Sequence, residues 1–293
     1  MVVKDIIRKA LADIEASGKN IPNPVGEIYI LLEHITGKDK LFLSLNKDFE
    51  VNEEAFFTLL NKRLNDTPMA YIIGKKYFRN IVLKTDERAL IPRFCTEELI
   101  DIVNAFIQTN DSVLDMCTGT GAIALAIKEE NTKVDVTCSD ISEDALYLAK
   151  ENAELNNLSI NFILSDLFEN ISGTYDILIS NPPYISSEEY MGLEKDIFKE
   201  PKLALVGGDL GYEYYEKIIK QAREKIKRMV FFEIGYDQGN IVKDILNVKE
   251  GKAYDVIKRL NKELEDKGYM TVRGRVPLDY LKERFNLCDE DVN

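Results

Sequence analysis

Four consecutive residues, Asn181-Pro182-Pro183-Tyr184, carry the most specific chemical pattern in this 293-residue sequence. They follow the apolar run 176–180, which is typical of a buried strand. The two prolines remove two backbone donors and stiffen the loop, so the Asn181 side-chain oxygen and the Pro182 carbonyl can both accept hydrogen bonds from one N–H₂ group. Such acceptors can orient a planar nitrogen whose delocalised lone pair makes it a poor nucleophile, and Tyr184 offers a face for stacking. A plain turn is the alternative.

A glycine-rich turn, Cys117-Thr118-Gly119-Thr120-Gly121, lies between a predicted strand over 112–116 and a predicted helix over 122–130. Small residues here let the backbone approach a nucleoside-like cofactor, and the start of the helix supplies unpaired N–H groups. A dinucleotide site would favour Gly-x-Gly-x-x-Gly instead, so that a pyrophosphate lies on the helix. A tight strand–helix turn that binds nothing also needs glycine and stays open as an interpretation.

An aspartate, Asp140, closes the next predicted strand, over 134–139, and lies 25 residues after Asp115. An acidic side chain at this place can accept hydrogen bonds from both hydroxyls of a ribose. It can also cap the helix predicted from Glu143, and both roles are compatible.

Strands and helices alternate from about residue 95 onward, and this order predicts a mostly parallel, doubly wound α/β sheet. In such a sheet ligands bind beyond the carboxyl ends of the strands, where the motifs above lie. The predicted helices cover 96–108, 122–130, 143–156 and 211–227, and the predicted strands cover 112–116, 134–139, 161–164, 175–180 and 229–234.

The first 70 residues have a different pattern, with apolar residues at helical spacing, such as Ile6, Ala10 and Ile14. A short hairpin over 77–83 then precedes the α/β part. We expect a helical substrate-recognition domain over 1–75, a hairpin linker over 76–90 and a catalytic domain over 91–293.

Composition narrows the possible functions. Lys and Arg total 38 against 51 Asp and Glu, a formal net charge of −13, which argues against extended nucleic-acid binding and favours protein or small-molecule substrates. The four cysteines form no Cys-x-x-Cys pair, so we expect neither a metal site nor a disulfide framework. The single histidine, His34, is expected to pack or lie on the surface. We see no signal peptide and no run long enough to span a bilayer, so the expected location is cytoplasmic.

Two resemblances follow from these residues. The run from Asp115 to Gly121 resembles the Asp-x-Gly-x-Gly-x-Gly loop of class I methyltransferases, with Cys117 in place of the first glycine. Over residues 60–245 the chain resembles the HemK/PrmC family, the protein-(glutamine N5) methyltransferases of class 1 peptide-chain release factors. The resemblance rests on 68–74, Leu90-Ile91-Pro92-Arg93, Asn181 to Tyr184, Glu200-Pro201, Gly207-Gly208 and 232–235 with Gln238.

The resemblance implies a Rossmann-like class I methyltransferase fold, S-adenosylmethionine as methyl donor and the glutamine of a Gly-Gly-Gln loop as acceptor. It implies a catalytic loop of Asn181, Pro182, Pro183 and Tyr184, and an adenine contact at Asp166. We expect no metal, and a monomer. The expected cofactor-binding residues are Thr96, Asp115, Cys117, Thr118, Gly119, Gly121, Asp140, Ile141, Asp166, Leu167 and Asn181.

The sequence departs from the family at Cys117, at Phe94-Cys95 and around Asp209. An extra charged helix is predicted over 250–267, and 268–276 resembles the family's closing strand only faintly. Three alternatives therefore stay open: a paralogue with another protein or small-molecule acceptor, a nucleic-acid N-methyltransferase, and a binding module without catalysis.

Overall fold

A computed structural model describes residues 1–246, so the helix predicted over 250–267 and the strand over 268–276 lie outside the described residues. The chain divides into two compact units. Of the described residues, one unit contains Met1–Lys75 together with Glu194–Lys199, and the other contains Lys76–Leu193 and 200–246. The sequence did not predict that Glu194–Lys199 belongs to the first unit.

The first unit is helical, as its apolar spacing predicts. Its helices are α1 (Val3–Ser17), α2 (Pro24–Thr36), α3 (Lys40–Leu45), α4 (Glu53–Leu64) and α5 (Met69–Ile73). One apolar face of each long helix is buried in a common core that includes Ile6, Leu32, Phe56 and Leu60. His34 is exposed, in agreement with the surface position expected for it.

Polar residues set where these helices begin. The side chains of Asn23, Asp39 and Asn52 accept hydrogen bonds from backbone N–H groups in the first turns of α2, α3 and α4. Such bonds satisfy donors that have no partner inside the helix. The boundaries of the small bundle therefore follow from local sequence.

The second unit begins with a two-stranded sheet of β1 (Lys75–Phe78) and β2 (Ile81–Lys84), as the predicted hairpin requires. Two asparagines of a later helix complete the hydrogen bonding of β2. Asn152 accepts from the Lys84 N–H at 2.6 Å, and Asn156 accepts from the Val82 N–H at 3.1 Å. The side chains thus take the place of a neighbouring strand.

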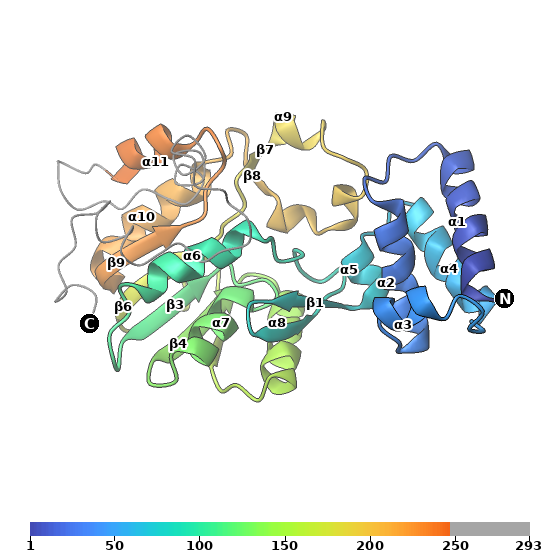
Figure 1. Ribbon diagram of the computed structural model, residues 1–293. Helices are drawn as coiled ribbons and strands as arrows, with labels where there is room; N and C mark the ends of the chain where they lie inside the picture. The colour runs from blue at the N-terminus through green and yellow to red at the C-terminus, as the bar shows by residue number, and fades with distance from the viewer. Residues whose placement is uncertain (247–293) are drawn as a thin grey trace, which may run out of the picture. The chain divides into compact units, whose positions relative to one another are not determined.

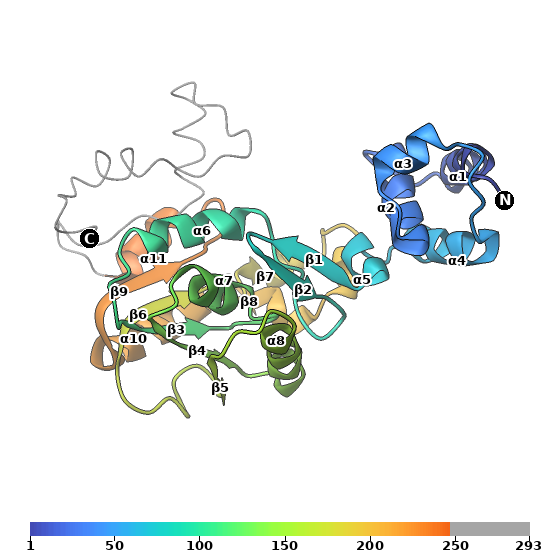
Figure 2. The same ribbon diagram turned by 60° about the horizontal axis from the view of Figure 1, so that its bottom comes forward.

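The main sheet has five parallel strands in the order β5-β4-β3-β6-β9 (Figures 1 and 2). These are β3 (Ser112–Met116), β4 (Asp135–Asp140), β5 (Asn161–Leu164), β6 (Tyr175–Ser180) and β9 (Ile226–Phe232). The predicted bounds hold for β3, β5 and β6, whereas β4 lies one residue later than predicted. β9 ends two residues earlier than predicted and begins three residues earlier, because Ile226 pairs with Tyr175. The predicted parallel α/β architecture is confirmed.

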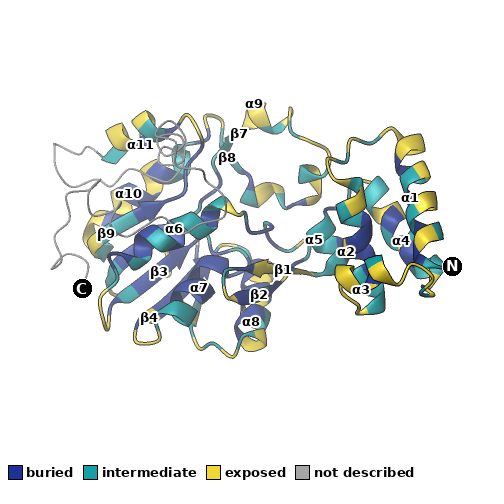
Figure 3. Ribbon diagram, in the orientation of Figure 1, coloured by how far each residue is buried: buried dark blue, intermediate teal, exposed yellow. Residues whose placement is uncertain are grey.

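Helices cover both faces of this sheet, because successive strand residues point to opposite sides. On one face Val113, Ile177 and Phe231 pack in a core with α6 (Cys95–Asn104), α7 (Ala122–Glu130) and α8 (Glu143–Leu155). On the other, Leu114 and Leu178 pack against α10 (Glu213–Lys225) and α11 (Gly239–Leu246). Figure 3 shows the central strands as almost wholly buried.

The segment between β6 and α10 contains short elements that the sequence did not predict. They are β7 (Ile185–Ser186), α9 (Ser187–Tyr190), β8 (Val206–Gly208) and two 3₁₀ turns at Ile197–Lys199 and Lys202–Ala204. β7 pairs with β8 in a separate parallel sheet. Within residues 1–246, no helix has the length and apolar character needed to cross a membrane.

Candidate active site

The sequence motifs meet at one pocket beyond the carboxyl ends of the sheet strands. Cys117, Gly119, Asp140 and Ile141 line it after β3 and β4. Asp166, Leu167, Asn181 and Pro183 line it after β5 and β6. The empty space between these residues is about 740 Å³, including open solvent at its mouth.

Asp115, in β3, holds the glycine loop by hydrogen bonds and is not among the residues that line the pocket. Its carboxylate is fully buried and accepts hydrogen bonds from the Thr118 hydroxyl at 2.5 Å and the Ala124 N–H at 3.1 Å. Burial raises the pKa of Asp115 to about 7, and these two hydrogen bonds oppose the shift. Its Oδ1 atom is buried without a partner among the described residues.

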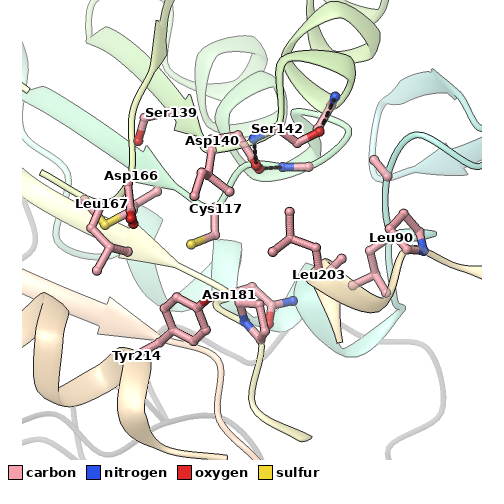
Figure 4. A pocket seen from close by; sticks show the side chains of 18 of the residues that line it. Leu90, Cys117, Ser139, Asp140, Ser142, Asp166, Leu167, Asn181, Leu203 and Tyr214 are labelled. Atoms are coloured by element: carbon pink, nitrogen blue, oxygen red, sulfur yellow. Dashed lines mark hydrogen bonds between the residues drawn. The ribbon is translucent and has the colours of Figure 1, made fainter. Parts of the chain in front are cut away.

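Asp140 joins the end of β4 to the glycine loop, as Figure 4 shows. Its Oδ2 accepts from the Gly119 N–H at 2.9 Å, and its Oδ1 accepts from the Ser142 N–H at 3.0 Å. The cap of α8 is Ser142, whose hydroxyl accepts from the Ala145 N–H, so the interpretation of Asp140 as that cap is wrong. Burial raises the pKa of Asp140, against these hydrogen bonds. Each oxygen retains a lone pair that can face the pocket.

The turn after β5 supplies a further wall. Ser165 donates to the Leu167 carbonyl at 2.9 Å and accepts from the Asn170 N–H at 2.9 Å, which fixes the turn. Leu167 is buried, whereas the Asp166 carboxylate is exposed at the edge of the pocket. An acceptor at this place can reach the amino group of a bound base.

The Asn181–Tyr184 loop forms the opposite side of the pocket from Asp140 in Figure 4. The Asn181 side chain is half-buried and makes no hydrogen bond to any of residues 1–246, and the Pro182 carbonyl accepts none from them. Tyr184 is half-buried, and burial followed by the nearby Glu233 carboxylate raises the pKa of its phenol. The loop therefore offers two acceptor oxygens beside a neutral aromatic ring.

Cys117 adopts a left-handed backbone conformation, with φ of 61°, which favours glycine. Its side chain lines the pocket, and burial together with the Asp140 carboxylate raises the pKa of the thiol. The thiol is therefore neutral near pH 7, and its β-carbon lies on a backbone conformation that glycine adopts at lower cost.

Six predicted cofactor-binding or catalytic residues are not among the residues that line the pocket: Thr96, Asp115, Thr118, Gly121, Pro182 and Tyr184. Thr96 donates its hydroxyl to Glu233 at 2.7 Å. Thr118 bonds Asp115, Gly121 precedes α7 as its N-cap, and Pro182 is buried. A direct cofactor contact at Thr96 stays a prediction.

Several lining residues were missed by sequence reasoning. Tyr214 of α10 faces the pocket beside Asn181 in Figure 4, and Leu203 lines another wall. Glu200 fixes the segment that contains Leu203. Its buried carboxylate accepts a hydrogen bond from the Ile91 N–H at 2.9 Å and pairs with Arg93 at 2.5 Å. Only the Glu200-Pro201 resemblance gave a signal for this segment.

The donors and acceptors fit a nucleoside cofactor that carries positive charge. Ser139 lines the pocket, and its buried hydroxyl has no partner among the described residues. Asp140 and Asp166 add carboxylates on the same side of the sheet. In the part of the chain that the structure describes, no group of three His, Cys, Asp or Glu side chains could hold a metal ion.

Comparison with known proteins gives two family matches. Residues 95–227 match the methyltransferase small domain, and residues 5–74 match the PrmC N-terminal domain. The hMettl16 catalytic domain shares the fold at a TM-score of 0.50, with 15% identity over 64% of this chain and 74% of that one. The second match extends the likeness to the N-terminus, beyond the region 60–245 recognised in the sequence.

Curated relatives agree along the chain. The release factor glutamine methyltransferase of Streptococcus pneumoniae is 40% identical over 74% of this chain and 80% of its own length. That of Chlamydia trachomatis serovar L2 is 31% identical over 99% of this chain and 95% of its own. The pocket, the Asn181–Tyr184 loop and these matches confirm the resemblance: this chain belongs to the release factor glutamine methyltransferase family.

Proposed function

We propose that this protein transfers a methyl group from S-adenosylmethionine to the side-chain amide nitrogen (N5) of a glutamine, the one in the Gly-Gly-Gln loop of class 1 peptide-chain release factors. One observation carries this function beyond family membership. The half-buried Asn181 amide has no partner within residues 1–246 and lies in the pocket next to the unused Pro182 carbonyl. An N–H₂ group supplies the two donors that these oxygens lack.

The Asn181–Tyr184 loop then acts by orientation and charge. The Asn181 side-chain oxygen and the Pro182 carbonyl accept the two N–H bonds of the glutamine amide and direct its nitrogen into the pocket. As the nitrogen gains positive charge, both oxygens stabilise it. Tyr184 remains a neutral phenol, because its pKa is raised, and packs against the planar amide. The nitrogen becomes acidic after methylation, so its proton can leave to water.

S-adenosylmethionine supplies a methyl group on a positively charged sulfonium. The spare lone pairs of Asp140 suit its ribose hydroxyls, and Asp166 suits the amino group of its adenine. The glycine loop lets the backbone approach it, and Cys117 and Leu167 provide apolar walls.

The helical unit over 1–75 is proposed to recognise the release factor. The match of 5–74 to the PrmC N-terminal domain supports this role. The net charge of −13 favours an acceptor protein with basic surfaces. We propose a cytoplasmic location, where a translation factor is available as acceptor.

The test is methyl transfer from labelled S-adenosylmethionine to purified class 1 release factors, with three matched acceptors. These are the native factor, a factor whose Gly-Gly-Gln glutamine is changed to glutamate, and a short DNA duplex. Label in the native factor alone supports the proposal. Equal label in the altered factor places the methyl elsewhere, and label in DNA alone favours a nucleic-acid N-methyltransferase.

A further inference from the structure

The Asn181–Tyr184 loop can be held in place by few backbone bonds. Pro182 and Pro183 have no N–H, so neither can donate a hydrogen bond that fixes the loop. At its start, Ser180 donates its hydroxyl to the Met116 carbonyl at 2.6 Å, and the Glu233 N–H donates to the Ser180 carbonyl. Beyond the prolines, the Ile185 N–H donates to the Leu205 carbonyl at the start of β7.

Gln238 supplies a further anchor from the segment between β9 and α11. Its side-chain amide donates to the Tyr184 carbonyl at 2.8 Å and to the Gly211 carbonyl at 3.2 Å. Its side-chain oxygen accepts from the Gly235 N–H at 2.9 Å. The side chain is therefore bonded at both ends and is only 7% exposed, so it has little freedom to move.

The surrounding backbone leaves space for this contact. A β-carbon at Gly211 would lie 2.6 Å from the Tyr184 carbonyl oxygen and 3.1 Å from the Gln238 nitrogen, and its φ of 84° also disfavours other residues. A β-carbon at Gly207 would collide with the Pro183 carbonyl. Gly207 and Gly211 thus let their own backbone segments lie close to the loop, near the Tyr184 carbonyl that Gln238 binds.

Gln238 is not among the residues that line the pocket, and its side-chain hydrogen bonds go to Tyr184, Gly211 and Gly235. Its effect reaches the reaction through the Tyr184 carbonyl, two residues from the Pro182 carbonyl and three from Asn181. Without Gln238 the loop would be tied by Ser180 before it and by the Ile185 N–H after it, which would let these oxygens move more freely relative to the sulfonium. Orientation is what such a site contributes.

We propose that Gln238 is a positioning residue for methyl transfer, which fixes the Asn181–Tyr184 loop by binding the Tyr184 carbonyl. This inference rests on the proposed function, because it assigns to the loop the task of holding the acceptor nitrogen. It predicts a loss in the rate of transfer at saturating substrate, with cofactor affinity retained, since the residues that the Gln238 side chain bonds, Tyr184, Gly211 and Gly235, are not among those that line the pocket.

The experiment compares the full-length wild type with Gln238→Met and Gln238→Asn. Methionine has a similar size but no donors, whereas asparagine keeps the amide but is one methylene too short to bond Gly235 and Tyr184 together. Gln221→Met is the control, because Gln221 is an exposed residue of α10 that bonds only the Lys217 carbonyl of its own helix. Each protein is assayed with a release factor as acceptor, and its affinity for S-adenosylmethionine and its melting temperature are measured.

We expect kcat to fall about ten- to a hundredfold in Gln238→Met and less in Gln238→Asn. The Kd for S-adenosylmethionine should stay within about twofold, and Gln221→Met should match the wild type. If Gln238→Met does not fold, the kcat and the cofactor Kd of Gln238→Asn test the inference instead. Folded variants with the wild-type kcat overturn the inference, and so does a parallel loss of cofactor affinity, which indicates a general structural role. An inactive wild type contradicts the proposed function instead.

Discussion

The Oδ2 atom of Asp140, at the end of β4, accepts a hydrogen bond from the backbone N–H of Gly119 at 2.9 Å. The sequence presents these residues as parts of two separate motifs, one for the ribose and one for the glycine loop. In the structure the two motifs are bonded to each other. The Asp140 carboxylate lines the pocket and also holds the glycine loop, which lines the pocket as well. Changes at Asp140 therefore alter two features of the cofactor site together.

Asp140→Asn should weaken S-adenosylmethionine binding by about tenfold or more, because an amide replaces one acceptor oxygen with a donor that faces a backbone N–H. Calorimetric titration measures the change in Kd. Asp144→Asn is the matched control, since Asp144 is exposed in the first turn of α8. Equal affinities in wild type and Asp140→Asn would show that this carboxylate does not support the cofactor.

Asp115 should make the stability of the protein depend on pH. Burial raises its folded-state pKa to about 7, whereas an aspartate in the unfolded chain titrates near about 4. Between these values the folded state holds a proton that the unfolded state releases, so this contribution to the free energy of unfolding is present at low pH and is lost as pH rises toward 7.

The check is a comparison of wild type with Asp115→Asn, which cannot titrate. Denaturant unfolding from about pH 4 to about pH 8 should show wild-type stability falling relative to the variant, by at most about 1.4 kcal/mol per pH unit. A difference in unfolding free energy that stays constant over this range would mean that Asp115 titrates normally.

Cys117→Gly should stabilise the protein by about 0.5–1 kcal/mol, because a left-handed backbone costs a residue with a β-carbon more than it costs glycine, and the flexible unfolded glycine chain offsets part of the gain. Thermal unfolding measures the effect. Cys117→Ala is the control: it removes the thiol but keeps the β-carbon, so its melting temperature should remain below that of Cys117→Gly. The opposite order would rule out backbone strain as the cost of this cysteine.

Arg79 should be important for stability. Its side chain is 7% exposed and pairs with Asp101 at 2.8 Å and Glu130 at 2.5 Å. Arg79→Met leaves two partly buried carboxylates without their cation and should cost about 3 kcal/mol in denaturant unfolding. Arg8→Met removes the exposed pair with Asp5, where the arginine is 82% exposed, and should cost about 0.5 kcal/mol or less. Similar costs for the two variants would contradict this account.

Local patterns predicted most of the sheet and of the pocket. The apolar runs of β3, β5 and β6 gave their bounds residue for residue, and α7 likewise. Cys117, Asp140, Asp166 and Asn181 line one pocket because parallel strands end at the same edge of a sheet. The order of the strands along the chain was therefore enough to predict that these four residues lie close together.

The remaining features depend on contacts that local patterns do not encode. β7 and β8 have two and three residues, too few for a periodic signal. Gln238 lies 54 residues from Tyr184, and Glu200 lies 109 residues from Ile91. The helix predicted over 211–227 is shorter at both ends, because Gly211 has a positive φ and Ile226 joins β9. Such pairings follow from the tertiary structure.

The most direct test of the account is a single-turnover methylation of a class 1 release factor by wild type and Asn181→Ala, with the site located by mass spectrometry. We predict one methyl group on the Gly-Gly-Gln glutamine with the wild type. With Asn181→Ala we predict a rate lower by about a hundredfold or more, at a cofactor Kd within about threefold of the wild type. An unchanged rate in the variant, or a methyl group on any residue other than a glutamine, would contradict the claim that Asn181 holds a glutamine amide for transfer.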